Sequence, residues 1–492
     1  MIQKTALIAR LGAFVVALTL AACAAGTGGA PREEERPALR REAMATAASP
    51  YAVNAAIEIL NAGGSAVDAA IAAELVLGLV EPQSSGIGGG GFLLHYDAAS
   101  ERLIGYDGRE RAPAGATPTM FLDTRGRPIP FLDAQASGRS IGAPSLMHML
   151  KLAHDDHGRL DWAQLFQPAI RLALEGFEVS PRLAALISAY AERGRLRADF
   201  GTRGYFFDRE GNPLAAGAVL RNPQYALTLQ ALAEQGPAAL TQGPLADAIV
   251  AAAQRNPRGG ALTHADLQAV EARRLEPVCA RYRVYRACTI GPPSSGNAVL
   301  AILGLYERAR PRPGGVDNVD DWSAFLWASR LAYADRDHYM ADDAFAPVPT
   351  QELIAPAYLD QRAQLINLTQ APARVDPGVP AGQELHDRWG RAISDDSGTT
   401  HLSIVDGWGN AVALTATVES GFGAQRMAGG FLLNNQLTDF ALSPKDEMGR
   451  LSVNRVEPGK RPRSSMAPMM VLQDGRPVIA LGSPGGSAII PY

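Results

Sequence analysis

A candidate nucleophile lies at Thr399, within the run Ser-Gly-Thr-Thr-His-Leu-Ser at residues 397–403. A threonine hydroxyl is a poor nucleophile unless a base lies beside it. Cleavage of the chain between Gly398 and Thr399 would supply that base, because a free α-amino group has a pKa of ~7.7–8.0 and is partly neutral near pH 7. Gly398 would provide the tight, flexible bond that such self-cleavage requires. Spacing alone is weak support for a catalytic role of Thr399, because two threonines beside a histidine at the start of a strand usually serve only to form the strand.

The elements that would position Thr399 follow from the hydrophobic pattern. Residues 400–405 and 411–418 alternate on either side of the turn Gly-Trp-Gly-Asn at 407–410, which predicts a β-hairpin. Other strands are predicted over 92–96, 431–433, 469–472 and 478–482, and helices over 52–60, 66–79, 298–306 and 322–340. The region 44–80 is interpreted as two helices, 141–310 as mostly helical and 362–390 as irregular. Helix 66–79 is apolar nearly all round, so we expect it to be buried, with Ser65 as its cap.

Composition excludes several classes of protein. Of 492 residues, 47% are hydrophobic and 20% are charged, which excludes a wholly disordered or fibrous chain. The net charge of -4 and the absence of a broad basic field argue against nucleic acid as a partner. Three cysteines exclude a cysteine-rich metal site. His154 and His157 have helical spacing, but Asp155, Asp156 and a glycine suggest a solvated helix end. We therefore expect no metal, and a threonine nucleophile requires no cofactor.

The N-terminal residues predict a targeting segment rather than part of the folded domain. Lys4 and Arg10 precede an apolar stretch, residues 11–22, which is too short for a bilayer span of ~20 residues. It ends in Leu-Ala-Ala-Cys at 20–23, which resembles a bacterial lipobox. We expect a lipoprotein signal peptide over 1–22, lipidation at Cys23 and a tether over 23–43. The protein would face the periplasm, anchored in a membrane, the outer membrane by preference. The alternative is an ordinary signal peptide with a chance cysteine.

The two other cysteines, Cys279 and Cys288, bear on that compartment, because the periplasm is oxidising. The segment 278–289 alternates and is compatible with a hairpin that turns near Arg283 and Val284, which would place the cysteines opposite each other. A disulfide and two unpaired strand cysteines both remain open. Neither interpretation gives the pair a catalytic role.

Ten sequence blocks carry a resemblance to a known family. They are 63–70, 88–92, 107–113, 167–173, 292–296, 333–336, 399–406, 431–440, 460–466 and 482–487, in order along residues 43–492. Together they resemble the γ-glutamyltransferase (γ-glutamyltranspeptidase, glutathione hydrolase) family of N-terminal-nucleophile hydrolases. The resemblance implies an α+β fold, the αββα four-layer sandwich. It also implies self-cleavage into a heterodimer of a large subunit, 44–398, and a small subunit that begins at Thr399.

The resemblance implies roles for individual residues. Thr399 would be the nucleophile and Thr417 would hydrogen-bond it, while the backbone N–H groups of Gly485 and Gly486 would form the oxyanion hole. The substrate's α-carboxylate would be bound by Arg109, Ser464 and Ser465, and its α-ammonium by Gln436 and Asp439. The expected donors are glutathione or other γ-glutamyl compounds. Water would then give hydrolysis, and an amino acid or peptide would give transpeptidation.

The sequence departs from the family at three places. Glu419 replaces a common Asn, so it either accepts from the ammonium or turns away to pair with an arginine. The lid segment 441–463 is short and lacks Tyr, which favours hydrolysis over transpeptidation. Both features keep open an acylase or amidase acting on glutaryl-type amides. Finally, residues 399–492 number 94, roughly half of the family's small subunit, so we expect a truncated chain that lacks the last part of that subunit. An inactive truncated lipoprotein with a scaffold or binding role is the remaining alternative.

Overall fold

The computed structural model describes residues 42–371, 373–383, 398–446 and 448–492. The predicted signal peptide, Cys23, most of the predicted tether and residues 384–390 of the irregular segment lie outside the described residues. No helix within the described ranges combines the length and the apolar composition that a bilayer crossing requires.

The α-helices are α2 Pro50–Asn61, α3 Ala66–Val80, α4 Phe131–Gln135, α5 Leu146–His157, α6 Gln167–Glu175, α7 Pro181–Arg193, α8 Phe200–Phe206, α9 Pro223–Gln235, α10 Ala238–Thr241, α11 Gly243–Gln254, α12 His264–Gln268, α13 Gly296–Ala309, α14 Val319–Tyr339 and α15 Pro356–Ala363. The strands are β1 Met44–Thr46, β2 Gly90–Asp97, β3 Arg102–Gly108, β4 Phe177–Glu178, β5 Val219–Leu220, β6 Arg273–Leu275, β7 Val278–Tyr282, β8 Tyr285–Thr289, β9 Gly398–Val405, β10 Ala411–Glu419, β11 Met427–Ala428, β12 Phe431–Leu432, β13 Met469–Gln473 and β14 Arg476–Leu481. Short 3₁₀ turns are η1 Gly138–Ser140, η2 Trp162–Phe166, η3 Glu352–Ile354, η4 Gln436–Asp439 and η5 Gly486–Ile489.

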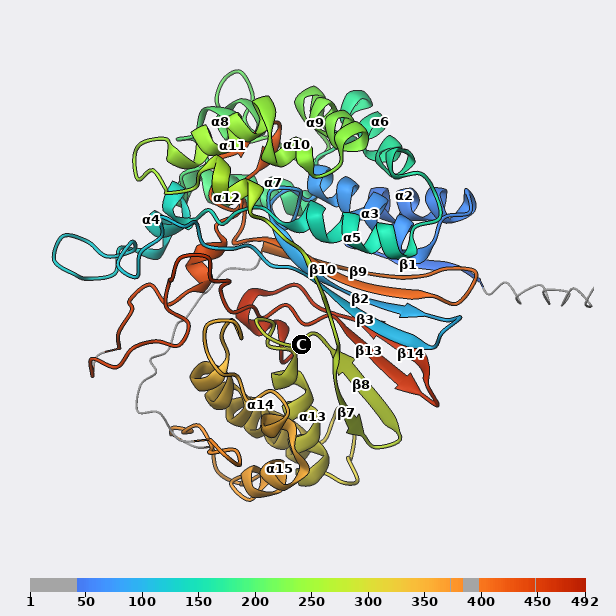
Figure 1. Cartoon of the computed structure of the whole chain (residues 1–492), viewed down its shortest axis with the longest axis vertical. Helices are drawn as coiled ribbons and strands as arrows, with labels where there is room; N and C mark the ends of the chain where they lie inside the picture. The colour runs from blue at the N-terminus through green and yellow to red at the C-terminus, as the bar shows by residue number, and fades with distance from the viewer. Residues whose placement is uncertain (1–41, 372, 384–397, 447) are drawn as a thin grey trace, which may run out of the picture. The chain divides into compact units, whose positions relative to one another are not determined.

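Two antiparallel sheets form the middle layers of the fold (Figure 1). The first has the strand order β1-β9-β10-β2-β3-β6, and the second has the order β14-β13-β8-β7. Apolar side chains from the facing surfaces make a shared core, which includes Phe92, Leu94, Ala413, Met470 and Leu472. Helices α2, α3 and α5 lie on the outer side of the first sheet, and α13, α14 and α15 lie on the outer side of the second (Figure 1). This is the expected αββα sandwich.

Helix α3 illustrates why these residues form these elements. Every one of its positions is buried, as its all-round apolar sequence predicts. Ser65 caps it in a reciprocal capping box: the Ser65 hydroxyl accepts from the backbone N–H of Asp68, and the Asp68 carboxylate accepts from the N–H of Ser65. The prediction of a buried helix with a Ser65 cap is therefore confirmed.

One local expectation is wrong and another holds only in part. Residues 44–46 are strand β1, paired with Ser403–Val405, and the first helix begins only at Pro50, whose ring suits the first helical turn. At the end of α5, Asp155 and Asp156 are exposed as expected, but His157 is not: its ring stacks on His95, with ring centroids 3.8 Å apart. His157 follows Ala153 and Leu150 at helical spacing, so it continues the buried face of α5.

The open question of Cys279 and Cys288 is answered by the β7–β8 hairpin. The two residues are directly paired across the strands, with Cα atoms 4.1 Å apart and the sulfurs joined in a disulfide. The hairpin turns at Arg283, which takes the left-handed conformation at φ 55°. The predicted position of the turn is confirmed.

Candidate active site

The hairpin β9–β10 places Thr399 opposite Thr417, and the hydroxyl oxygens are 3.2 Å apart. Thr417 donates to the Gly398 carbonyl oxygen at 2.8 Å and accepts from the backbone N–H of Glu419 at 2.8 Å. A hydroxyl has one hydrogen, so the proton between the two threonines belongs to Thr399. The Thr399 hydroxyl therefore donates to Thr417, and the Thr417 hydroxyl donates to the carbonyl oxygen of Gly398.

A β-bulge between Thr417 and Glu419 ends the regular pairing of β10. Glu419 there takes the left-handed region at φ 82°, which is uncommon for a residue with a side chain. Bulges bend a strand and re-aim its side chains, and they are frequent beside active sites. Here the bulge brings the Glu419 side chain into the same cavity as the two threonines.

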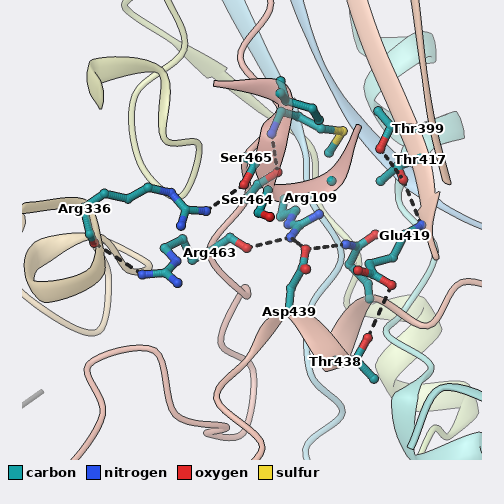
Figure 2. A pocket seen from close by; sticks show the side chains of 15 residues that line it. Arg109, Arg336, Thr399, Thr417, Glu419, Thr438, Asp439, Arg463, Ser464 and Ser465 are labelled. Carbon is teal, nitrogen blue, oxygen red and sulfur yellow. Dashed lines mark hydrogen bonds and ion pairs between the residues drawn. The ribbon is translucent and has the colours of Figure 1, made fainter. Parts of the chain in front are cut away.

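The cavity has a free volume of about 50 Å³ and lies between β9–β10 and the segments that follow them (Figure 2). Its lining consists of Arg109, Arg336, Thr399, Thr417, Glu419, Gln436, Thr438, Asp439, Arg463, Ser464, Ser465, Met466, Gly486, Ser487 and Ile489. Of the predicted site residues around Thr399, all but Gly398 and Gly485 line this cavity, although they come from segments up to 377 positions apart in the chain.

Arg109 and Asp439 form a direct ion pair, with the guanidinium Nη2 2.5 Å from the carboxylate Oδ2 (Figure 2). Gln436 donates to the same carboxylate oxygen at 2.8 Å. Arg109 also donates to the main-chain carbonyls of Pro462 and Arg463, at 3.0 and 2.8 Å. Its side chain is fully buried. The site thus presents one positive and one negative group side by side, which matches the two charges of an α-amino acid.

A buried ion network holds the strand end that carries Arg109. Asp107 accepts from the backbone N–H of Arg109 at 2.7 Å, and its second oxygen lies 2.8 Å from Arg461 and 2.7 Å from Arg273. Arg461 is in turn paired with Asp342 at 2.8 Å. Sequence reasoning assigned no role to these residues. Their burial in a paired network fixes the position of Arg109 before any substrate arrives.

Glu419 is buried and faces the cavity, where Asn435 donates to its Oε2 at 2.5 Å. Ser420 and Thr438 also donate to this oxygen. Burial, and then the nearby charge of Asp439, raise the pKa of Glu419 to about 8, and a hydrogen bond to Asp439 contributes in the same direction. Glu419 is therefore mostly a neutral acid at pH 7. Its side chain lines the cavity rather than turning away from it.

Two arginines that the sequence did not single out line the cavity beside the serines. Arg336 donates to Ser465 Oγ at 2.7 Å and to Ser295 Oγ at 2.9 Å. Arg463 lies 3.2 Å from Asp337, and burial together with Arg336 lowers its pKa to about 10. Arg336 lies in the block 333–336 and Arg463 in the block 460–466, so membership of a motif block is the sequence signal that could have identified them.

The two predicted oxyanion glycines are placed differently. Gly486 lines the cavity at the start of η5, whereas Gly485, at φ 138°, is not among the lining residues. The hydroxyl of Tyr333 donates to the carbonyl of Ser487 and holds this turn against α14. In the described part of the lid segment, only Arg463 contributes to the lining, so the cavity has no cover from residues 441–446 or 448–462. The described residues contain no cluster of metal-ligating side chains.

The fold and site together define an N-terminal-nucleophile hydrolase of the αββα type. Residues 52–492 match the family model of gamma-glutamyltranspeptidase. The chain belongs to the gamma-glutamyltranspeptidase family. It is 35% identical over 458 residues to the glutathione hydrolase proenzyme of Bacillus subtilis (strain 168), and the match covers 92% of this chain and 76% of that one.

Two solved structures share the architecture. The cephalosporin acylase of Bacillus halodurans has a TM-score of 0.77 and 26% identity, and the match covers 94% of this chain and 82% of the acylase chain. The gamma-glutamyltranspeptidase of Helicobacter pylori has a TM-score of 0.65 and 31% identity, covering 70% of this chain and 96% of that chain. Glutamyl-transferring and acylase-type relatives therefore share this fold.

Proposed function

We propose that the chain is a self-processing γ-glutamyltransferase or glutathione hydrolase that acts through Thr399. The observation that carries the proposal is the position of the Thr399 hydroxyl in one cavity with the Arg109–Asp439 pair. The pair suits the α-carboxylate and α-ammonium of a γ-glutamyl group, and Ser464, Ser465 and Gln436 supply further polar contacts. The α-amino acid end would thus be held while its γ-carbonyl lies near Thr399.

Self-cleavage would begin with attack of the Thr399 hydroxyl on the Gly398 carbonyl carbon. The hydroxyl of Thr417 donates to that carbonyl oxygen and would stabilise the charge that develops there. The C–N bond breaks, its nitrogen takes the hydroxyl proton, and water hydrolyses the resulting ester. The large subunit then ends at Gly398, and Thr399 gains a free α-amino group.

In the mature heterodimer, the Thr399 amine would take the hydroxyl proton while the oxygen attacks the γ-carbonyl of the donor. The amide bond breaks, the leaving amine receives the proton, and a γ-glutamyl ester remains. Backbone N–H groups near Gly485 and Gly486 would stabilise the oxyanion. Water or an amino acid or peptide amine then resolves the ester. We propose that water is the main acceptor, because Arg463 is the one residue in the described part of the lid segment that lines the cavity.

Intact mass and denaturing gels of the purified chain test this proposal. We expect two fragments that meet at Gly398 and Thr399, and a single chain for Thr399→Ala. Thr400→Ala is the matched control, because the buried Thr400 hydroxyl has no hydrogen-bond partner and does not line the cavity. It should cleave normally. An uncleaved wild-type chain, or equal cleavage of Thr399→Ala, would refute the assignment of Thr399.

An acylase or amidase for glutaryl-type amides is the second candidate, favoured by the neutral Glu419 and by the likeness to a cephalosporin acylase. An uncharged carboxyl group tolerates a substrate that lacks the ammonium. Comparing γ-glutamyl and glutaryl anilides as substrates of the mature protein separates the two. A higher kcat/KM for the γ-glutamyl anilide supports the first proposal, and the reverse order supports the acylase.

We also propose that acylation of Cys23 anchors the protein in a bacterial membrane, the outer membrane by preference, facing the periplasm. The support is the positive start, the short apolar stretch and the Leu-Ala-Ala-Cys run at 20–23. Incorporation of labelled palmitate, lost in Cys23→Ser, is the expected result. Labelling that persists in the variant would place the anchor elsewhere.

A further inference from the structure

A second cavity, of about 140 Å³, lies away from Thr399 and shares no lining residue with the candidate active site. Four of its lining residues are arginines from three separate segments: Arg195 after α7, Arg255 and Arg258 after α11, and Arg426 before β11. Gln425 also lines it. The segments therefore converge to place four guanidinium groups around one small space.

The positive charge around this cavity exceeds the negative charge. Asp133 is shared between two of the arginines, at 2.8 Å from Arg195 and 3.1 Å from Arg258. Asp199 pairs with Arg255 at 2.6 Å. Two carboxylates thus face four guanidinium groups, and the surplus of positive charge attracts a multivalent anion.

Arg426 is mostly buried, and its guanidinium donates hydrogen bonds to main-chain carbonyls. Its Nη1 donates to Ala252 and Arg255, and its Nη2 donates to Pro257, at 2.7–2.8 Å. Burial, followed by the charge of Arg255, lowers its pKa to about 10. Carbonyl dipoles and the charge of Asp199 favour its cationic form, and an anion in the cavity would stabilise that form further.

Two buried donors at this cavity lack a partner. The Nε2 of Gln425, a residue only 1% exposed, makes no hydrogen bond, whereas its Oε1 accepts from the backbone N–H of Arg195 at 2.6 Å. The Nε of Arg258 is likewise buried and unpartnered. Unsatisfied buried donors are costly and rare, so each calls for an acceptor. Both residues also hold the left-handed backbone region, at φ 52° and 58°, a conformation that clusters at ligand sites.

We propose that this cavity binds a phosphate group, either free or carried by a small metabolite. Guanidinium groups and side-chain amides are the donors that recognise phosphate oxygens, and a phosphate offers enough acceptors to satisfy Gln425 and Arg258 together. The site is additional to the proposed acyl-transfer function and does not depend on it.

The test uses the mature full-length protein in phosphate-free buffer. Inorganic phosphate and glycerol 3-phosphate are titrated separately, at constant ionic strength with chloride, while Tm and the heat of binding are recorded. A ligand that binds only the native state raises Tm in a saturable way. We expect such a rise with at least one of the two. A saturable rise with inorganic phosphate alone indicates a site for the free anion. A rise with glycerol 3-phosphate alone indicates a site for phosphorylated metabolites.

Gln425→Glu is the decisive variant, because it keeps the acceptor for Arg195 and replaces the unpartnered donor with a carboxylate. We expect phosphate affinity to fall by about tenfold or more, and the ligand-free Tm to stay level or rise. Gln361→Glu, an exposed change on α15 with the same charge, should bind phosphate normally. Arg258→Gln should also weaken binding. The proposal is overturned if wild-type protein shows no saturable response, or if Gln425→Glu responds as strongly as Gln361→Glu.

Discussion

The buried carboxyl group of Glu419 predicts a pH dependence that distinguishes the two candidate functions. Glu419 lines the cavity and has its pKa raised to about 8 by burial and by Asp439. At pH 7 it is ~10% ionised and at pH 9 it is ~90% ionised. Glu419→Gln imitates the neutral acid, because an amide still accepts from Asn435 and can donate to Asp439. The wild type and the variant should therefore behave alike below pH 7 and differ above pH 8.

The magnitude follows from the type of hydrogen bond. A neutral carboxyl group that bonds the substrate's ammonium contributes about 1 kcal/mol, and an ionised one contributes about 1.5–3 kcal/mol. A difference of ~1.4 kcal/mol is about tenfold in kcat/KM. For a γ-glutamyl anilide, the ratio of wild type to Glu419→Gln should thus rise from about one at pH 6.5 to about tenfold at pH 9. For a glutaryl anilide the same ratio should fall as the pH rises, because this substrate has no ammonium to pair with the ionised Glu419.

The assay is kcat/KM for both anilides across this pH range, with mature wild type and Glu419→Gln measured in parallel. Taking the ratio cancels titrations common to both enzymes, such as that of the Thr399 amine. Glu58→Gln, an exposed residue paired with Arg171, is the control and should leave the ratio at one. A ratio that stays constant with pH, or that moves in the same direction for both substrates, would refute this reasoning.

Three other predictions concern maturation and stability. Thr417→Val should slow both self-cleavage and turnover by ~10²-fold. Timed gels should show that Thr415→Val, on the same face of β10, cleaves normally. Equal cleavage rates for the two variants would contradict the role of Thr417. Replacing Cys279 and Cys288 with Ala should lower the free energy of unfolding by ~2–3 kcal/mol with kcat unchanged, measured by urea unfolding. Burial lowers the pKa of His95 to about 3, so below pH ~6.5 the unfolded chain takes up a proton at this residue before the folded chain does. The free energy of unfolding should therefore be highest above pH ~6.5 and fall on acidification by ~1.4 kcal/mol per pH unit. His95→Phe should flatten that slope, and an unchanged slope would assign acid sensitivity to other groups.

Elements with a strong local signal were predictable from the sequence. The alternation of 400–405 and 411–418 led to the β9–β10 hairpin, and the all-round apolar residues of 66–79 led to buried α3. Strand β1 was missed because three residues are too few to show a period, and its pairing with β9 is set by chain segments more than 350 positions apart. Local pattern cannot carry that information.

The candidate site was predictable as a set of residues but not as a set of contacts. The motif blocks led to Arg109 and Asp439 separately, one for each charge of the substrate. Their direct ion pair depends on tertiary packing across 330 positions of the chain. The same holds for Arg336, whose bond to Ser465 joins α14 to the segment before β13. Such contacts join segments that only the folded chain brings together.

The Arg109–Asp439 pair itself bears on which substrates the site accepts. An α-amino acid end can replace the pair with two new pairs, carboxylate to Arg109 and ammonium to Asp439, so no buried charge loses its partner. A glutaryl chain would pair with Arg109 but leave Asp439 with only Gln436 and Glu419 beside it. Asp439 is only partly buried, but a carboxylate in the cavity that loses its guanidinium partner is still disfavoured. We therefore expect the site to discriminate against substrates that lack the amine.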